Sequence, residues 1–189
     1  RLKFSLSHLA GCLVTHEHGD HAKAVKDLLK AGVDVYLSEG TAKTLAIEHH
    51  RLHTVKARAW FSVGDWLVMA FPVVHDAEEP FGFLVCREDA RLLYLTDTAY
   101  SPFRFKNLTH IMVECNYALD ILQKNVAAGL VPAAVQDRVL RSHFSLENVK
   151  EFLKANDLSK VQEIWLLHLS DGNSDAERFK REIQELTGK

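Results

Sequence analysis

The stretch "THEHGDH", residues 15–21, places three histidines and one aspartate within a short segment. The apolar run "GCLVT", residues 11–15, leads directly into it and has the pattern of a buried strand. Binding groups commonly begin where a buried strand leaves a sheet, because the sheet holds them on a rigid support. The sequence therefore predicts a functional loop at this strand end, with a solvated polar loop as the alternative.

The spacing within the loop allows two metal ions to be bound. In an extended segment, side chains two residues apart project to the same side, so His16 and His18 can reach one ion together. Gly19 then permits a sharp change of direction. Asp20 and His21, at the start of the helical pattern that follows, can face a second ion. One loop could thus serve a dinuclear site.

Three further polar residues stand where apolar runs end. His75 closes "MAFPVVH", Asp97 closes "LLYLTD" and His168 closes "IWLLH". A single histidine after a strand is more often structural, but three such strand ends together with the loop favour one shared site. Two zinc ions need more nitrogen and oxygen ligands than the loop supplies. The candidate metal ligands are therefore His16, His18, Asp20, His21, His75, Asp97 and His168.

The composition is that of an ordinary globular protein. The chain has 189 residues, 47% hydrophobic and 25% charged, and we expect a single domain over residues 1–189. The formal net charge of -2 neither favours nor excludes nucleic acid as a partner. The sequence contains no secretory signal and no apolar run of about 20 residues, so we expect a cytoplasmic protein with no membrane association.

Apolar runs and helical periodicities alternate along the chain and predict a mixed α/β fold. Buried strands are expected over residues 11–15, 34–38, 66–74, 81–87, 92–96, 111–115 and 164–168. A helical pattern begins at Ala22, and Ser145 and Asp175 are placed to cap two later helices. Sheets covered by helices fit this order best. The three cysteines lie in apolar runs, which predicts buried free thiols and no disulfide framework.

With these residues in view, the chain resembles the metallo-β-lactamase fold superfamily over nearly its whole length. The segments "VVHDAEEPFGFLV", residues 73–85, and "LTDTAYS", residues 95–101, look like the bacterial and phage branch of metal-dependent hydrolases, which has nuclease-like, ribonuclease Z-like relatives. The resemblance implies an αββα sandwich of the metallo-β-lactamase type. It also implies a dinuclear metal site at which the seven candidate ligands meet.

The resemblance divides these ligands between two ions. It implies that His16, His18 and His75 hold the first ion, that Asp20, His21 and His168 hold the second, and that Asp97 bridges both. Asp20 is also expected among the catalytic residues. Zinc is the leading cofactor because the ligands are rich in histidine, while the aspartates also suit manganese or iron.

A further histidine carries more information about the reaction. His143 in "RSHFS" stands before a helix capped by Ser145, and a similar histidine in the ribonuclease Z branch lies near the leaving group without binding metal. The resemblance therefore implies a catalytic role for His143, and Glu114 could orient it. The alternatives are a helix-terminal histidine bonded to the backbone and a carboxylate at the surface.

The chain also departs from the family pattern at both ends. Only fourteen residues precede Thr15, where family members usually have further strands, and the chain ends at Lys189, where relatives tend to add a short closing strand. We therefore expect the N-terminal strands and the C-terminal closing strand to be lacking. Exposed sheet edges would then allow an oligomer to form through another copy of the chain.

Three functions are consistent with these residues. The first is hydrolysis of a phosphodiester by a metal-bridging hydroxide, with His143 as the general acid. The second is hydrolysis of a thioester or lactone, as in enzymes of the glyoxalase II type, and the third is metal binding without turnover. The expected partner is nucleic acid or a small phosphodiester. Basic residues that could contact phosphates, or could simply lie on solvated helix faces, are Lys23, Lys26, Lys30, Arg138 and Arg141.

Overall fold

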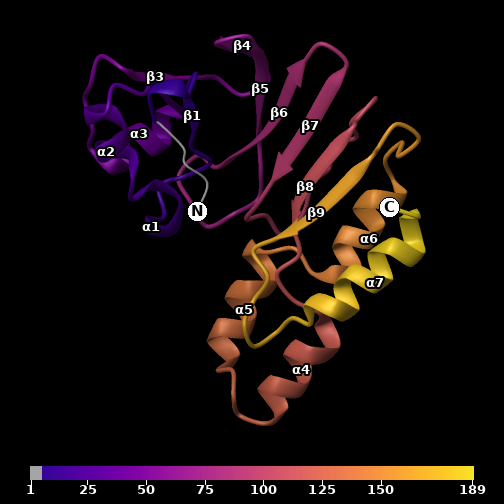
Figure 1. Ribbon diagram of the computed structural model, residues 1–189. Coiled ribbons are helices and arrows are strands. Elements are labelled where there is room, and N and C mark those ends of the chain that lie inside the picture. The colour runs from indigo at the N-terminus through magenta and orange to yellow at the C-terminus, as the bar shows by residue number, and fades with distance from the viewer. Residues whose placement is uncertain (1–5) are drawn as a thin grey trace. The chain divides into compact units, whose positions relative to one another are not determined.

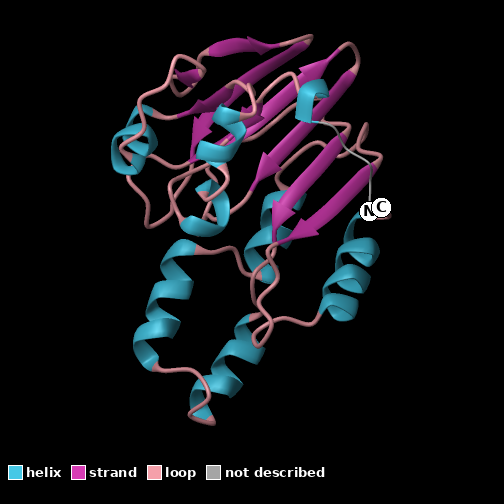
Figure 2. Cartoon of the chain, turned by 60° about the vertical axis from the view of Figure 1, so that its left-hand side comes forward, coloured by secondary structure: helices cyan, strands magenta, loops and turns pink. Residues whose placement is uncertain are grey.

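The computed structural model describes residues 6–189, which form two compact units (Figure 1). The first unit runs to Pro72 and also includes Asp76–Glu88. The second consists of Val73–His75 and Asp89–Lys189. Helices and strands alternate in both units, as Figure 2 shows, so the mixed α/β class expected from the sequence is confirmed. A single domain over the whole chain stays a prediction.

The first unit begins with a short parallel sheet. After the 3-10 helix η1 (Leu6–His8), the strands β1 (Cys12–Leu13), β2 (Val35–Leu37) and β3 (Leu52–Thr54) pair in that order. The helices of this region are α1 (Gly19–Ala22), α2 (Val25–Lys30) and α3 (Glu39–Leu45). Apolar side chains of strands and helices share one core, to which Val14, Val25, Leu29, Val35 and Leu37 belong. This core supports the strand end from which the histidine loop emerges.

Three antiparallel strands complete the first unit. They are β4 (Trp60–Val63), β5 (Trp66–Pro72) and β6 (Phe81–Arg87). Val63 lies opposite Trp66 in the tight hairpin between β4 and β5. Gly64 in that turn has φ of +56°, a conformation that costs glycine little because it has no Cβ.

The second unit is a parallel sheet with helices. The strands β7 (Ala90–Leu95), β8 (His110–Glu114) and β9 (Glu163–Leu167) pair in sequence order. The helices are α4 (Leu119–Ala127), α5 (Ala133–Ser142), α6 (Leu146–Lys154) and α7 (Ala176–Thr187). Because the strands are parallel, their carboxyl ends meet at one edge of the sheet. Asp97, Glu114 and His168 stand at these ends.

The two caps expected from the sequence are confirmed. Ser145 Oγ accepts a hydrogen bond from the backbone N–H of Asn148 at 3.1 Å, at the start of α6. Asp175 Oδ1 accepts one from the backbone N–H of Arg178 at 3.0 Å, at the start of α7. Each side chain satisfies a helical N–H that has no intrahelical acceptor.

The element predictions hold for the strands and less well for the helices. Each of the seven expected strands overlaps an observed one, although β1 is reduced to two residues. The helix expected from Ala22 instead begins at Gly19 and is split into α1 and α2, so Asp20 and His21 lie within a helical turn. The sequence patterns did not predict β3, β4, α3, α4 or α5. All three cysteines are free, as expected, but only Cys86 and Cys115 are buried, while Cys12 is half-buried because it lies in the two-residue strand β1.

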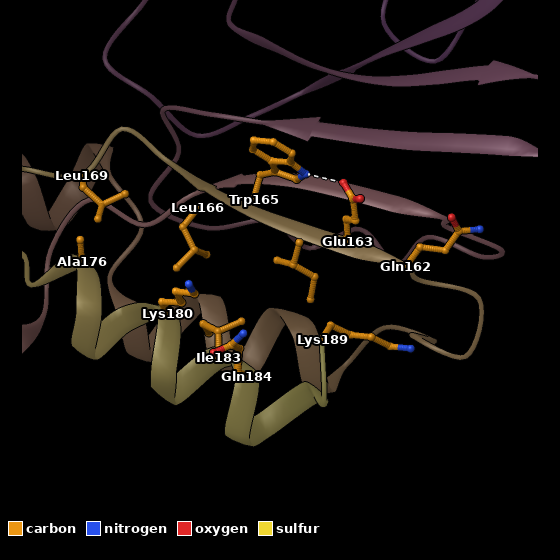
Figure 3. Close-up of a pocket in the computed structure, with 11 residues that line it drawn as sticks. Gln162, Glu163, Trp165, Leu166, Leu169, Ala176, Lys180, Ile183, Gln184 and Lys189 are labelled. Carbon is orange, nitrogen blue, oxygen red and sulfur yellow. Dashed lines mark hydrogen bonds between the residues drawn. The ribbon is translucent and has the colours of Figure 1, made fainter.

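An open groove lies between β9 and α7, as Figure 3 shows. Its volume is about 470 Å³, and Leu166 of β9 points toward α7, where Ile183 lies, whereas Trp165 points away from the helix. The indole N–H of Trp165 donates to Glu163 at 3.0 Å. Within residues 6–189, β9 has a sheet neighbour on one side only. Oligomer formation through a sheet edge stays a prediction.

Among the helices that the structure describes, none has the length and apolar character needed to cross a membrane.

Removing a side chain from the first core should destabilise the chain. Leu37 has no exposed surface, so Leu37→Ala should lower the free energy of unfolding by about 2–5 kcal/mol, the usual cost of a buried leucine. Leu130→Ala, at a position that is 74% exposed, is the control and should change it by less than about 0.5 kcal/mol. Urea unfolding followed by circular dichroism measures both. Equal effects would contradict the assignment of this core.

Candidate metal centre

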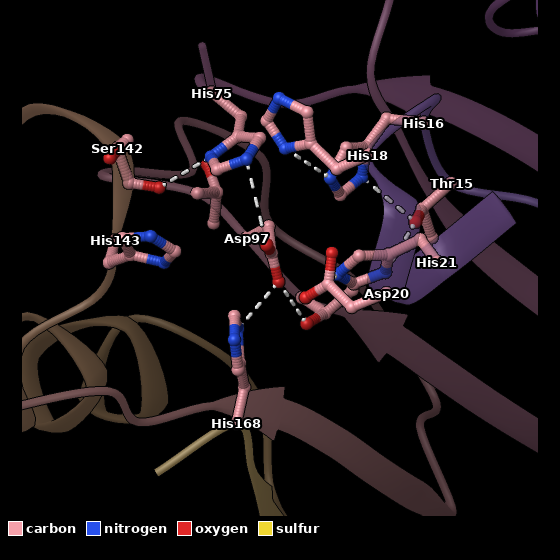
Figure 4. A network of polar contacts seen from close by, with 12 residues as sticks. Thr15, His16, His18, Asp20, His21, His75, Asp97, Ser142, His143 and His168 are labelled. Atoms are coloured by element: carbon pink, nitrogen blue, oxygen red, sulfur yellow. Dashed lines mark hydrogen bonds and ion pairs between the residues drawn. The ribbon is translucent and has the colours of Figure 1, made fainter. Parts of the chain in front are cut away.

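In the first unit, the Thr15 hydroxyl organises the histidine loop. Thr15 Oγ1 lies 3.1 Å from His16 Nδ1 and 3.2 Å from His21 Nδ1, and Thr15 itself is buried (Figure 4). If each Nδ1 donates its proton to this oxygen, Nε2 of each ring carries the lone pair that a metal needs. One hydroxyl can thus set the tautomer of two candidate ligands.

The backbone of the loop is held by its neighbours in the first unit. Glu17 lies between His16 and His18. Its carboxylate accepts a hydrogen bond from Glu78 N–H at 2.7 Å and one from the Thr41 hydroxyl at 3.2 Å. Burial raises the pKa of the Glu17 carboxyl, but these hydrogen bonds outweigh it and hold the pKa below its usual range. Phe81 N–H also donates to the Thr15 carbonyl at 2.9 Å. The loop therefore has little freedom to move away from its strand.

In the second unit, the two carboxylate oxygens of Asp97 face different histidines. Oδ1 lies 2.8 Å from His168 Nδ1, and Oδ2 lies 3.6 Å from His75 Nε2. Figure 4 shows the two imidazoles on opposite sides of Asp97. His75 Nδ1 is 2.8 Å from the Ser142 carbonyl, to which it donates, so the lone pair of His75 is on the nitrogen nearer Asp97. A carboxylate placed in this way can bridge two cations.

Glu114 contacts both His168 and His143 and so connects the surroundings of Asp97 to His143. Its side chain has no exposed surface, and Oε2 accepts hydrogen bonds from the backbone N–H groups of Thr98 at 3.0 Å and Phe144 at 3.1 Å. Oε1 lies 2.5 Å from His143 Nδ1 and 3.1 Å from His168 Nδ1. The candidate pairing of Glu114 with His143 is therefore present as a direct contact. Its catalytic role remains a proposal.

The cluster of Asp97, Glu114, His143 and His168 attracts positive charge. One potential ligand atom from each of these residues lies within 4.8 Å of the others. Hydrogen bonds to Asp97 and then to Glu114 raise the pKa of His168 to about 10, against the opposing effect of burial. Two buried carboxylates side by side require compensating cations.

Two residues of this cluster have an unusual backbone conformation. Asp97 has φ of +46° and His168 has φ of +52°, in the left-handed region that side chains with a Cβ rarely adopt. The Asn116 side-chain amide donates to the His168 carbonyl at 2.9 Å and holds that turn. Strained residues of this kind persist where the surrounding structure over-determines them, and they are common at functional sites.

The donor set fits divalent metal ions. Two nitrogen ligands at about 2.0–2.1 Å from a tetrahedral Zn²⁺ lie about 3.3 Å from each other. His16 Nε2 and His18 Nδ1 are 3.0 Å apart, and Asp20 Oδ2 and His21 Nε2 are 3.4 Å apart. The contacts of Asp97 with His75 and His168, at 3.6 and 2.8 Å, lie on either side of this distance. The two ligand pairs of the histidine loop are therefore spaced as metal coordination requires.

The predicted site residues form two groups, one in each unit. The first contains His16, His18, Asp20 and His21, and the second contains His75, Asp97, Glu114, His143 and His168. That the two groups share one pair of ions stays a prediction. The sequence patterns gave no role to the Thr15 hydroxyl, the Ser142 carbonyl or the Asn116 amide. Of these three residues, only Thr15 belongs to a motif that the sequence singles out, the stretch at residues 15–21.

Comparison with curated proteins finds two exodeoxyribonucleases. Exodeoxyribonuclease WalJ of Streptococcus pneumoniae is 28% identical over 180 residues, which cover 88% of this chain and 65% of that protein. Exodeoxyribonuclease YycJ of Bacillus anthracis is 28% identical over 199 residues, which cover 97% of this chain and 73% of that protein. The chain therefore spans slightly less than two thirds of the length of the streptococcal relative.

Solved structures with the same fold include proteins of different names. The metallo-beta-lactamase fold protein YhfI from Bacillus subtilis superimposes with a TM-score of 0.68 at 11% identity, covering 93% of this chain and 70% of that one. The short form of human tRNase Z gives a TM-score of 0.59 at 17% identity, covering 89% of this chain and 76% of that one. At these identities the likeness shows the fold alone. It confirms the metallo-β-lactamase type of fold expected from the sequence.

The family match covers most of the sequence. A family described as "Beta-lactamase superfamily domain" matches residues 2–168, a range that contains every predicted metal ligand as well as Glu114 and His143. The resemblance derived from the histidine motif and the strand-end residues is confirmed at the level of the family. The chain belongs to the beta-lactamase superfamily.

Proposed function

We propose that this chain is a dinuclear metal-dependent phosphodiesterase that hydrolyses DNA. The observation that carries the proposal is the position of Asp97, whose carboxylate oxygens face His75 on one side and His168 on the other. In the proposed assignment, His75 joins His16 and His18 at the first ion, and His168 joins Asp20 and His21 at the second. Asp97 would contribute a ligand to each ion.

The ions and the protein have separate tasks in this proposal. Two divalent ions would supply a water of lowered pKa as the nucleophile and positive charge against the phosphoryl oxygens. Zinc is the preferred ion because five of the seven ligands are histidines. Asp20, whose side chain is largely exposed, can both bind an ion and accept a hydrogen bond from the nucleophile.

Proton transfer to the leaving group is assigned to His143. Its Nδ1 contacts the buried Glu114 carboxylate, which fixes the ring and leaves Nε2 to donate to the departing sugar oxygen. Glu114 is fixed in turn by backbone N–H groups from Thr98 and Phe144. Glu114 is therefore a positioning residue for His143. A thioester, whose leaving thiolate needs little protonation, would not require this pair.

DNA is proposed as the substrate because the curated relatives WalJ and YycJ are named exodeoxyribonucleases. Basic side chains on α2 and α5 are exposed and can contact phosphates, among them Lys26, Lys30, Arg138 and Arg141. Binding to DNA should then weaken strongly as the salt concentration rises.

Metal content tests whether the two groups of ligands share their ions. The purified chain should contain about two ions, and His18→Ala and His75→Ala should each remove the same one. The double variant should therefore still contain about one ion per chain, as measured by elemental analysis. Asp97→Ala, which removes the bridge, should lower the content further than either single change.

The exposed His50 supplies the control, since His50→Ala should leave the metal content unchanged. If the His18 and His75 losses add in the double variant, each unit binds its own ion and the shared centre is wrong.

The role of His143 can be tested with two leaving groups. His143→Ala should keep both ions but lower kcat/KM on DNA by about 10²–10⁴-fold, the usual range for loss of a general acid. On bis(p-nitrophenyl) phosphate the loss should be much smaller, because p-nitrophenolate leaves without a proton. Steady-state kinetics on the two substrates measures the difference.

Glu114→Gln should show the same pattern as His143→Ala with a smaller loss, since the ring remains but its orientation is weakened. Loss of metal in His143→Ala would make His143 a ligand, contrary to the assignment. Hydrolysis of a glutathione thioester by a chain that leaves DNA intact would overturn the proposed function.

A further inference from the structure

A cavity of the second unit is lined by segments that follow Asp97 and His143 of the candidate metal centre along the chain. Its volume is about 260 Å³, and it is lined by the loop that follows Asp97 and by α6. The loop contributes Tyr100, Ser101, Phe103 and Arg104. Phe144, which follows His143 directly, also lines it. The cavity thus lies within one residue of the proposed general acid along the chain.

Phe103, Phe144 and Phe152 line the cavity, and the ring of Phe105 packs against two of them without lining the cavity itself. The ring centroids of Phe144 and Phe152 are 6.1 Å apart, and those of Phe152 and Phe105 are 6.5 Å apart. Phe103 extends this group, with its centroid 6.4 Å from that of Phe105. Such mutually packed rings form a stable apolar surface. These rings give the wall an apolar part suited to a flat ring system, beside the polar groups of Ser101 and Arg104.

One buried polar group of the cavity lacks a partner. Ser101 is only 8% exposed, and its hydroxyl oxygen has no hydrogen-bond partner. It is the one buried side-chain nitrogen or oxygen in this condition among residues 6–189. Buried hydroxyls are nearly always hydrogen-bonded, because an unmade bond is costly. Because the oxygen itself is buried, a ligand in the cavity would supply the missing bond after the Ser101 side chain rotates toward it.

The rim of the cavity carries one aromatic ring and one cation. Tyr100 is 59% exposed, so its ring is open to a ligand. Arg104 is exposed, and within the described part of the chain it forms no ion pair or hydrogen bond. Glu151, the acidic residue of the lining, is bonded to Lys154 at 2.8 Å. An exposed ring beside an arginine without a partner is the combination that binds single-stranded nucleic acid.

We propose that this cavity is a nucleobase subsite, which holds the base of the nucleotide next to the scissile phosphate. The proposal rests on the proposed function, since it names a contact of the same DNA substrate. The base lies against the phenylalanine wall and Tyr100, the Ser101 hydroxyl bonds the edge of the base, and Arg104 contacts a neighbouring phosphate. The volume, below the roughly 300–1,000 Å³ of pockets for drug-sized ligands, suits one ring system.

Two p-nitrophenyl substrates isolate the contribution of the base. The p-nitrophenyl ester of thymidine 5'-monophosphate carries a base and bis(p-nitrophenyl) phosphate does not, while the leaving group is the same. The double variant Tyr100→Ala with Arg104→Ala should lower the ratio of kcat/KM for the nucleotide ester to kcat/KM for the base-free diester. The expected decrease is about 5- to 150-fold, the range for loss of one base-stacking contact. Ser101→Ala should lower it less.

The matched control is Trp165→Ala with Arg181→Ala, which removes an exposed ring and an exposed cation outside the cavity. This variant should keep the parent ratio. An unchanged ratio in the Tyr100 and Arg104 variant, or the same decrease in the control, would overturn the subsite.

A binding measurement separates this proposal from the proposed function. Titration calorimetry should find that thymidine 5'-monophosphate binds the metal-loaded chain more tightly than inorganic phosphate, and that the Tyr100 and Arg104 variant loses this preference. If the parent chain hydrolyses neither ester but keeps the preference, the catalytic proposal fails and the subsite stands. If the two ligands bind equally, the subsite fails whatever the activity.

Discussion

Two carboxylates buried side by side, those of Asp97 and Glu114, impose the constraint on which the second unit depends. An ionised carboxylate out of water requires hydrogen bonds and opposite charge. Glu114 receives backbone N–H groups from the segments after β7 and before α6, and His143 approaches its other oxygen. Asp97 receives the Thr96 hydroxyl and lies between two imidazoles. Strand ends, helix starts and histidines are therefore held together by the need to compensate two negative charges.

This arrangement explains why the candidate centre lies at strand ends. Parallel strands bring their carboxyl ends together, and loops at that edge can change without disturbing the sheet. The loop after β7 has two parts with different proposed roles. Asp97 is proposed as a metal ligand, while Tyr100, Ser101 and Arg104 line the cavity. Within one fold, the first part of such a loop can fix the chemistry while the next part selects the substrate.

The sequence predicted the strands and the metal ligands because both leave local patterns. Buried strands are short apolar runs, and the ligands either crowd into one motif or end such a run. Helices α4 and α5 were not predicted, although α4 shows a clear amphipathic pattern in the structure. The contact between Glu114 and His143 joins residues 29 positions apart, so sequence could offer it only as a guess. The Ser142 carbonyl and the cavity beside Phe144 depend on tertiary packing, which leaves no pattern in the chain.

The left-handed backbone of Asp97 and His168 has a consequence for which residues these two turns accept. Glycine adopts this conformation without steric repulsion, and among residues with a Cβ it is asparagine, aspartate and histidine that adopt it most readily. The aspartate and the histidine therefore suit the backbone of their turns while they supply a carboxylate and an imidazole. A β-branched residue at either position would lose the polar group and strain the turn as well.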